Sequence, residues 1–66
     1  MVYYYKLFDL LEKRGIRLST FRNFLSNKTV AKLRKNEYLN TRTIAKICLY
    51  LRCQPGDIME VYENET

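Results

Sequence analysis

Amide and amine side chains recur on one face of a short predicted helix in the middle of the chain. Residues 26–36 read Ser-Asn-Lys-Thr-Val-Ala-Lys-Leu-Arg-Lys-Asn. At about 100° per residue, a single arc of roughly 140° holds Asn27, Lys28, Ala31, Lys32 and Lys35. Val30 and Leu33 fall on the opposite side, where a core would lie. The small Ala31 in the middle of the polar face lets this face approach a partner closely.

These side chains suit the edges of DNA bases. An asparagine such as Asn27 can form paired hydrogen bonds with adenine, and lysines such as Lys28 and Lys32 can donate to O6 and N7 of guanine. We therefore hypothesise that this helix lies in the DNA major groove. The solvated face of an ordinary helix would have a similar composition, so the pattern alone leaves that alternative open.

The distribution of charge also favours a polyanionic partner. The 66-residue chain has a net charge of +5, but residues 13–46 contain ten basic residues against the single acid Glu37, a net charge of +9. Residues 54–66 contain four acids and no base, a net charge of −4. A basic middle and an acidic end predict one side that faces a polyanion and another that is kept away from it.

Composition excludes several other classes of function. The chain has no histidine, and Cys48 and Cys53 are five residues apart, so we predict no metal site and interpret both cysteines as small core residues. There is no phosphate-cradling glycine loop and no catalytic constellation, so we predict neither a cofactor nor an enzyme. No apolar run approaches the ~20 residues of a membrane span, and no signal peptide is visible. We therefore expect a cytoplasmic protein without a membrane partner, and a single domain over residues 1–66.

Hydrophobic periodicity and capping residues predict an all-α domain. The predicted helices span Lys6–Arg14, Ser19–Leu25, Ser26–Asn36, Asn40 or Thr41 to about Arg52, and a last helix beginning at Gln54. Gly15 can close the first helix and Asn36 the third, because both tolerate the left-handed conformation. Ser26 is a good N-cap for the helix with the polar face. Ser19 is the natural cap of the helix before it, with Arg17 as the alternative boundary.

Two apolar ends flank these helices. Val2–Tyr5 has high strand propensity, and we predict that it pairs with the Ile-Met-Glu-Val-Tyr segment at residues 58–62. Packing of Tyr3–Tyr5 against this C-terminal segment or a second subunit is favoured over stacking on bases. Leu49 and Tyr50 lie off the apolar stripe of their helix, which makes them either a flank of the core or part of a dimer interface.

A short helix, a tight turn and a second helix form a helix-turn-helix, in which the second helix reads the major groove and its surroundings hold the phosphates. The start of the helix near residue 40 offers free N–H groups and a positive dipole end to an anion. We predict phosphate contacts on both sides of the recognition helix, from Arg17, Ser19, Arg22, Lys35, Asn40, Thr41, Arg42 and Thr43. These contacts fix register rather than sequence.

Four stretches carry a resemblance to a known family. They are Leu7-Phe-Asp-Leu-Leu-Glu-Lys-Arg-Gly-Ile16, Thr29-Val-Ala-Lys-Leu-Arg-Lys-Asn36, Thr43-Ile-Ala-Lys-Ile-Cys48 and, most specific, Cys53-Gln-Pro-Gly-Asp-Ile-Met-Glu60. With them the chain resembles the Cro and phage-repressor type (Xre-like) of helix-turn-helix regulators, especially the small stand-alone bacterial forms. The resemblance implies a five-helix, lambda-repressor-like domain that acts as a dimer on a partly palindromic operator. It also implies that Asn27, Lys28 and Lys32 face bases and that Ser26 caps the recognition helix.

The chain departs from this family in one place. The usual Ala-x-x-x-Gly-Ile turn between the two motif helices is missing, and residues 21–30 are about two residues short. The usual cap of the first motif helix is here Arg17. This departure predicts a shortened or tilted first motif helix and weakens the expected contacts from Ser19 and Arg22.

The sequence thus predicts a sequence-specific transcriptional regulator, a repressor, that binds double-stranded DNA as a homodimer. One alternative is an antitoxin-like protein-interaction module that uses Leu49, Tyr50 and the acidic end. Another is an RNA-binding protein with Tyr3–Tyr5 as a stacking platform.

Overall fold

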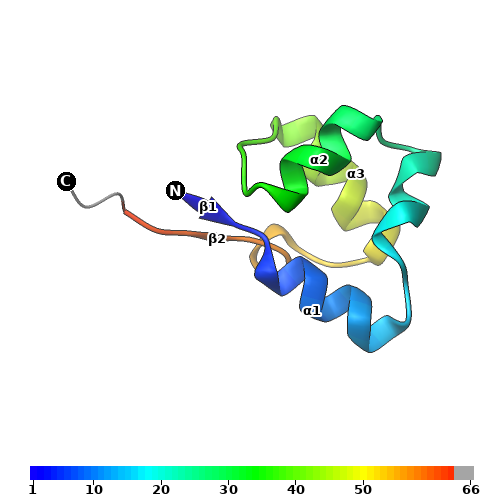
Figure 1. Ribbon diagram of the computed structural model, residues 1–66. Helices are drawn as coiled ribbons and strands as arrows, with labels where there is room; N and C mark the ends of the chain where they lie inside the picture. The colour runs from blue at the N-terminus through cyan, green and yellow to red at the C-terminus, as the bar shows by residue number, and fades with distance from the viewer. Residues whose placement is uncertain (64–66) are drawn as a thin grey trace.

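Five helical segments and two short strands make up residues 1–63, the part of the chain that the computed structural model describes. In chain order they are β1 (Val2–Tyr3), α1 (Tyr5–Arg14), the 3₁₀-helix η1 (Leu18–Asn23), α2 (Asn27–Arg34), α3 (Thr41–Leu51), the 3₁₀-helix η2 (Pro55–Asp57) and β2 (Glu60–Val61). Figure 1 shows the helices gathered at one end and the two strands leading away from them. The all-α expectation with short terminal strands is confirmed, although two of the five helical segments are 3₁₀-helices.

The two ends of the chain pair with each other. β1 and β2 are antiparallel, with Val2 opposite Val61 and Tyr3 opposite Glu60. The amino group of Met1 donates to the carbonyl oxygen of Tyr62 at 2.6 Å, and the N–H of Tyr62 donates to the carbonyl oxygen of Met1 at 2.8 Å. The predicted pairing is confirmed, but β1 is shorter than Val2–Tyr5. The side chain of Tyr4, the residue after β1, is buried in the core, and α1 begins at the next residue.

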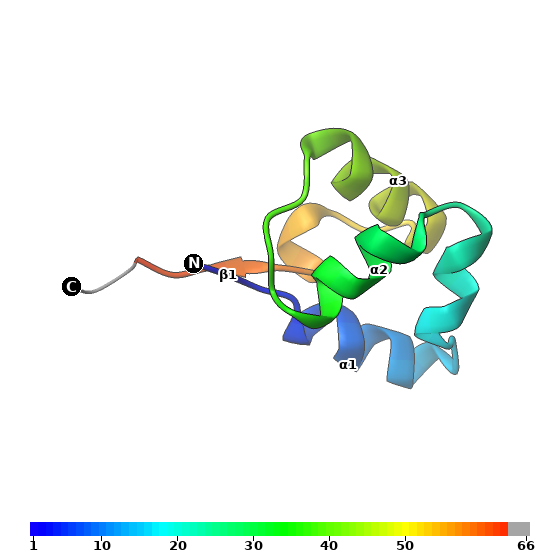
Figure 2. The ribbon, with the colours of Figure 1, turned by 45° about the horizontal axis from the view of Figure 1, so that its top comes forward.

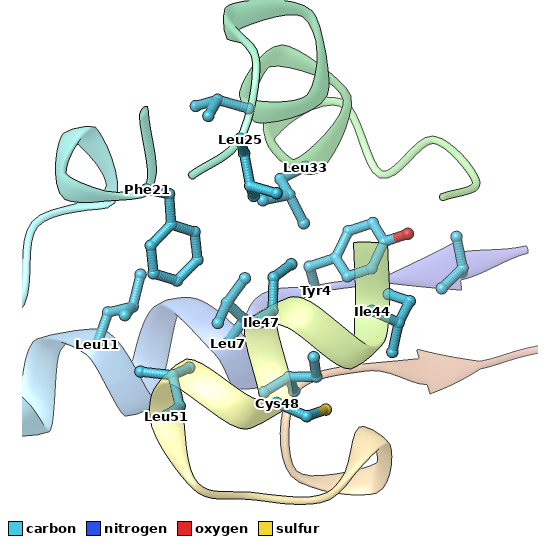
Figure 3. Packing of buried hydrophobic residues seen from close by; sticks show 13 residues of the cluster. Tyr4, Leu7, Leu11, Phe21, Leu25, Leu33, Ile44, Ile47, Cys48 and Leu51 are labelled. Carbon is cyan, nitrogen blue, oxygen red and sulfur yellow. The ribbon is translucent and has the colours of Figure 1, made fainter. Parts of the chain in front are cut away.

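A single apolar cluster holds the elements together (Figure 3). Its buried members are Val2, Tyr4, Leu7, Leu11, Phe21, Leu25, Val30, Leu33, Ile44, Ile47, Cys48, Leu51 and Ile58. Every helical segment except η2 contributes to it, and Ile58 follows η2 directly. The predicted stripe of α3, at i, i+3, i+4 and i+7 spacing from Ile44, is buried as expected.

All three α-helices end in the same way, with a residue in the left-handed conformation followed by a backbone hydrogen bond that spans five residues. The left-handed residues are Gly15 (φ 67°), Asn36 (φ 57°) and Arg52 (φ 54°). The hydrogen bonds run from the N–H of Ile16 to Leu11, of Glu37 to Lys32 and of Cys53 to Cys48, at 2.9, 3.0 and 3.0 Å. This is the Schellman motif, which satisfies carbonyl groups that the helix leaves free. The predicted helix ends at Gly15 and Asn36 are confirmed.

The segment before α2 differs from the predicted α-helix Ser19–Leu25. It is a 3₁₀-helix over Leu18–Asn23, and the residue at its N-cap is Arg17 rather than Ser19. No side chain caps this helix, so the preference of serine for a cap position did not decide the boundary. The N–H of Thr20 instead donates to the carbonyl oxygen of Arg17 at 3.0 Å, which begins the tighter 3₁₀ pattern.

The predicted last helix is a single turn. η2 spans only Pro55–Asp57, with Gln54 at its N-cap and the N–H of Gln54 donating to Oδ2 of Asp57 at 2.9 Å. The segment then becomes extended and forms β2. The cap position at Gln54 is confirmed, and the residues after η2 become extended, as the predicted pairing of residues 58–62 with the N-terminal segment required.

Candidate nucleic-acid interface

The two faces of α2 have opposite environments. Val30 and Leu33 are 2% and 0% exposed and point into the core. On the other side, Asn27 and Lys28 are exposed and Lys32 is half-buried. The three predicted base-contacting residues therefore share an accessible face of one helix. Ala31, also half-buried, separates them as expected.

A serine and a buried leucine fix where α2 begins. The N–H of Thr29 donates to Oγ of Ser26 at 3.2 Å, and the two hydroxyl groups lie 3.0 Å apart. This is the predicted N-cap, in which a side-chain oxygen accepts a hydrogen bond from the first turn. Leu25, directly before it, is in the core. The start of the helix is thus held by one hydrogen bond and one apolar contact.

The other end of α2 is held by the N-terminal segment. The backbone N–H of Tyr4 donates to Oδ1 of Asn36 at 3.0 Å, and the hydroxyl of Tyr4 donates to the carbonyl oxygen of Glu37 at 2.8 Å. Tyr4 itself is 1% exposed. Burial raises the pKa of its hydroxyl above the usual value. Our sequence interpretation missed this anchor. A tyrosine flanked by strand-forming residues gives no signal of a partner 32 residues away.

η1 adjoins the beginning of α2 and packs against it. Arg17, Ser19 and Arg22 are all exposed, and none of their side chains makes a hydrogen bond or ion pair within residues 1–63. In both ribbon views η1 lies on one side of α2 while the first turn of α3 lies on the other (Figures 1 and 2). The predicted phosphate contacts in η1 and in the first turn of α3 therefore lie on the two flanks of α2, which carries the predicted base contacts.

The first turn of α3 has a side-chain cap of its own. Oδ1 of Asn40 accepts a hydrogen bond from the N–H of Thr43 at 2.8 Å. The N–H groups of Thr41 and Arg42 remain without a partner inside the helix, since the first four N–H groups of an α-helix have none there. Both residues are exposed, and Thr43 is half-buried. This turn retains donors and a positive dipole end that an anion could meet.

Few carboxylates compensate the basic side chains. Within residues 1–63 the only ion pair joins Nζ of Lys6 to Oε1 of Glu60, at 3.5 Å and far from α2 in the sequence. Lys35, the C-cap residue of α2, is exposed like the bases of η1. The predicted contact residues therefore keep their positive charge available to a partner. In the same part of the chain no group of three or more potential metal-ligating side chains occurs.

The aromatic residues of the first five positions do not form an open platform. Tyr4 is buried, and the ring of Tyr3 packs edge-on against Tyr62 with centroids 5.4 Å apart. The hydroxyl of Tyr5 hydrogen-bonds to Oε2 of Glu60. The expected packing against the C-terminal segment is confirmed for Tyr3 and Tyr5, whereas Tyr4 packs into the core against the end of α2. Little remains of the stacking surface that single-stranded RNA would need.

The two apolar residues off the stripe of α3 have different surroundings. The ring of Tyr50 lies 4.9 Å from that of Phe24 and 5.8 Å from that of Phe21, so it is a flank of the core. Leu49 is 78% exposed. Only Leu49 remains a candidate for a contact with another molecule.

Comparison with known proteins decides the family. The model of the Cro/C1-type HTH DNA-binding domain matches residues 5–64. The chain belongs to the Cro/C1-type helix-turn-helix family. It is also similar to a solved structure, described as the crystal structure of the transcriptional regulator VanUg, Form II. The two share 38% identity over 96% of this chain and 87% of that one, with a TM-score of 0.90. No curated protein matches.

Membership of this family makes the chain a DNA-binding domain of the kind found in transcriptional regulators, as the sequence resemblance implied. Within residues 1–63, no helix has the length and apolar character that crossing a membrane requires. The 3₁₀ form of the first motif helix is compatible with the family fold, since the match to the regulator structure has a TM-score of 0.90 and covers 96% of this chain.

Proposed function

We propose that α2 is the recognition helix and lies in the major groove of double-stranded DNA, with Asn27, Lys28 and Lys32 facing bases. The observation that carries the proposal is the division of α2 into a buried face and an accessible, uncompensated polar face. Amide and amine groups on such a face match the acceptors and donors of the major groove. The cap at Ser26 and the anchor at Tyr4 hold the helix at both ends, so its side chains meet the bases in a fixed register.

The flanking elements supply the phosphate contacts in this proposal. The residues assigned to them are Arg17, Ser19 and Arg22 from η1, Lys35 from the end of α2, and Asn40, Thr41, Arg42 and Thr43 from the start of α3. Their positions on both sides of α2 would grip the backbone at either edge of the groove. Such contacts position the recognition helix but carry no sequence information.

We further propose that the protein is a repressor that acts as a homodimer on a partly palindromic operator. A dimer with two-fold symmetry places two recognition helices in successive major grooves, about 34–36 Å apart. Repression needs only that the bound dimer cover a promoter, which the DNA-binding surface alone provides. In a bacterial cell, which the resemblance to small stand-alone bacterial regulators implies, the DNA lies in the cytoplasm, so the proposal places the protein there.

Alanine substitutions on α2 test the assignment of the base-reading face. Lys28→Ala and Lys32→Ala should each lose about 1–3 kcal/mol of specific binding, because each removes a donor to a base edge. The measurement is a titration with operator duplex and with a scrambled duplex at fixed salt. The operator itself comes from selection of bound sequences from a random duplex pool.

Lys13→Ala is the matched control. Lys13 is an exposed lysine in the last turn of α1 and is assigned no DNA contact. It should lower operator and scrambled-duplex affinity equally and only slightly. Operator affinity and sequence preference that survive both α2 substitutions would show that another face reads the bases.

A further inference from the structure

The end of α3 brings two cysteines together. The N–H of Cys53 donates to the carbonyl oxygen of Cys48 at 3.0 Å, across Arg52 in the left-handed conformation. This is the hydrogen bond that defines a Schellman motif, and the two side chains at its ends commonly contact each other. These two positions usually hold apolar groups, and here they hold two thiols.

The other helix ends show that this pairing is particular to α3. At the end of α1 the same two positions hold Leu11 and Ile16, an apolar pair, and at the end of α2 they hold Lys32 and Glu37. The same backbone geometry thus accepts three kinds of pair. Cys48 and Cys53 fulfil the packing role of the first kind and add a chemistry that neither of the others has.

The thiol pair is accessible from one side. Cys48 is 8% exposed, whereas Cys53 is half-buried, and both are free thiols. The two line a surface hollow together with Ala45, Leu49 and Pro55. Burial raises the pKa of the Cys48 thiol, and the neighbouring Cys53 thiol raises it further through charge and hydrogen bonding. The backbone hydrogen bond between the two residues and the hollow that both line place the two thiols close together.

We propose that Cys48 and Cys53 form a dithiol that a peroxide oxidises to an intramolecular disulfide. The more accessible Cys53 thiolate attacks hydrogen peroxide, which breaks the O–O bond, gives a sulfenic acid and, after taking up a proton, releases one water. The sulfur of Cys48 then attacks the sulfenic sulfur of Cys53. The S–S bond forms as the S–O bond breaks, and the hydroxyl group leaves with the proton of Cys48 as a second water. Sulfur loses two electrons in total and the peroxide gains them.

The disulfide would link the last turn of α3 to the segment that leads into η2 and β2. Cys53 is the second residue after α3, and Gln54, the cap of η2, follows it. The inference rests on the helix end alone and does not depend on which face of the protein binds DNA.

Oxidation of the wild-type chain followed by tryptic mapping tests the proposal. Hydrogen peroxide should lower the mass of the monomer by about 2 Da, the mass of two hydrogen atoms, and remove both thiols from alkylation. Trypsin cleaves after Lys46 and Arg52, which separates the two cysteines onto different peptides. Under non-reducing conditions the peptides 47–52 and 53–66 should therefore travel as one species, and dithiothreitol should release them.

Two matched variants localise the reaction. Cys53→Ala and Cys48→Ala each leave one thiol, so neither should lose 2 Da as a monomer. Circular dichroism establishes that each variant remains helical before oxidation. If the variant at the buried Cys48 fails to fold, the tryptic map of the oxidised wild-type chain still tests the disulfide by itself. The proposal is overturned if the oxidised wild type contains only intermolecular disulfides, only higher oxides of Cys53, or two thiols that still react.

Discussion

Arg42 and Lys28 are both exposed bases, but we expect them to contribute differently to DNA binding. Lys28 lies on the polar face of α2, whereas Arg42 lies in the first turn of α3, among backbone N–H groups without helical partners. A side chain beside such a turn suits a phosphate, which is the same for every sequence. The roles of the two residues can therefore be distinguished by measuring specificity as well as affinity.

Arg42→Ala should weaken specific and non-specific binding to the same extent. Because one phosphate contact is lost, the slope of log affinity against log salt should become shallower by about 1. Titrations with operator and scrambled duplexes between low and moderate salt measure both quantities. A loss confined to the operator would instead assign Arg42 to a base.

Tyr4 is the residue on which the position of α2 depends most directly. Tyr4→Phe removes the hydrogen bond to the carbonyl oxygen of Glu37 and keeps the buried ring. We expect a loss of about 1 kcal/mol in the free energy of unfolding, measured by urea denaturation. Tyr38→Phe is the control. Because Tyr38 is 71% exposed, loss of its hydroxyl should change the free energy of unfolding little.

The same residue gives the protein an alkaline limit. Burial raises the pKa of Tyr4 in the folded state above its value of 10.0 in the unfolded state. The contribution of protonated Tyr4 to the free energy of unfolding is therefore complete below pH 10. It is lost as the pH rises through the folded pKa, because the tyrosine of the unfolded chain ionises first. The pKa of the Cys48 thiol is likewise raised, from an ordinary value of 9.0. Its ionisation therefore also lowers the free energy of unfolding as the pH rises, beginning at a lower pH than for Tyr4. Urea denaturation from pH 8 to pH 11 should show a smaller loss for Tyr4→Phe than for wild type, and an equal loss would exclude Tyr4 as a source.

At the scale of elements, η1 covers with six residues a distance for which an α-helix would need more. A 3₁₀-helix rises about 2.0 Å per residue and an α-helix about 1.5 Å. The six residues of η1 therefore span ~12 Å, as much as eight residues of α-helix. If the chain is about two residues short before α2 relative to its family, as its sequence predicts, the greater rise per residue of η1 would make up the missing length. The gap predicted that this helix would be altered, but local propensity does not distinguish a 3₁₀-helix from a short α-helix.

The cap of α2 should matter more than the serine in η1. Ser26→Ala removes the acceptor for the N–H of Thr29 and should cost about 1 kcal/mol of stability, within the usual range for a lost N-cap. Ser19→Ala, at an exposed position that caps nothing, should cost less than about 0.5 kcal/mol. Urea denaturation followed by circular dichroism compares the two. Equal effects would mean that the hydrogen bond of Ser26 adds nothing to the start of α2.

For the whole molecule, most of the fold could be predicted from periodicity and capping residues. The faces of α2 and α3 follow from the spacing of apolar side chains, and Gly15, Ser26 and Asn40 mark helix boundaries by their chemistry. What could not be predicted depends on contacts between distant segments. The anchor of Tyr4 on Asn36 joins segments 32 residues apart, and no local pattern in either segment signals it. The polar face of α2 was predictable as a face, while its role toward bases remains a prediction.

The two-fold symmetry of a dimer should be visible in the DNA that the protein selects. If two copies place their recognition helices in successive major grooves, sequences selected from a random duplex pool should contain an inverted repeat with half-site centres about 10–10.5 base pairs apart. Insertion of five base pairs between the half-sites should abolish tight binding, because it turns the second half-site to the opposite side of the duplex. Sedimentation of the complex should give two chains per operator. A selected sequence with a single half-site and one chain bound would contradict the homodimer and leave the assignment of α2 to be judged by its own variants.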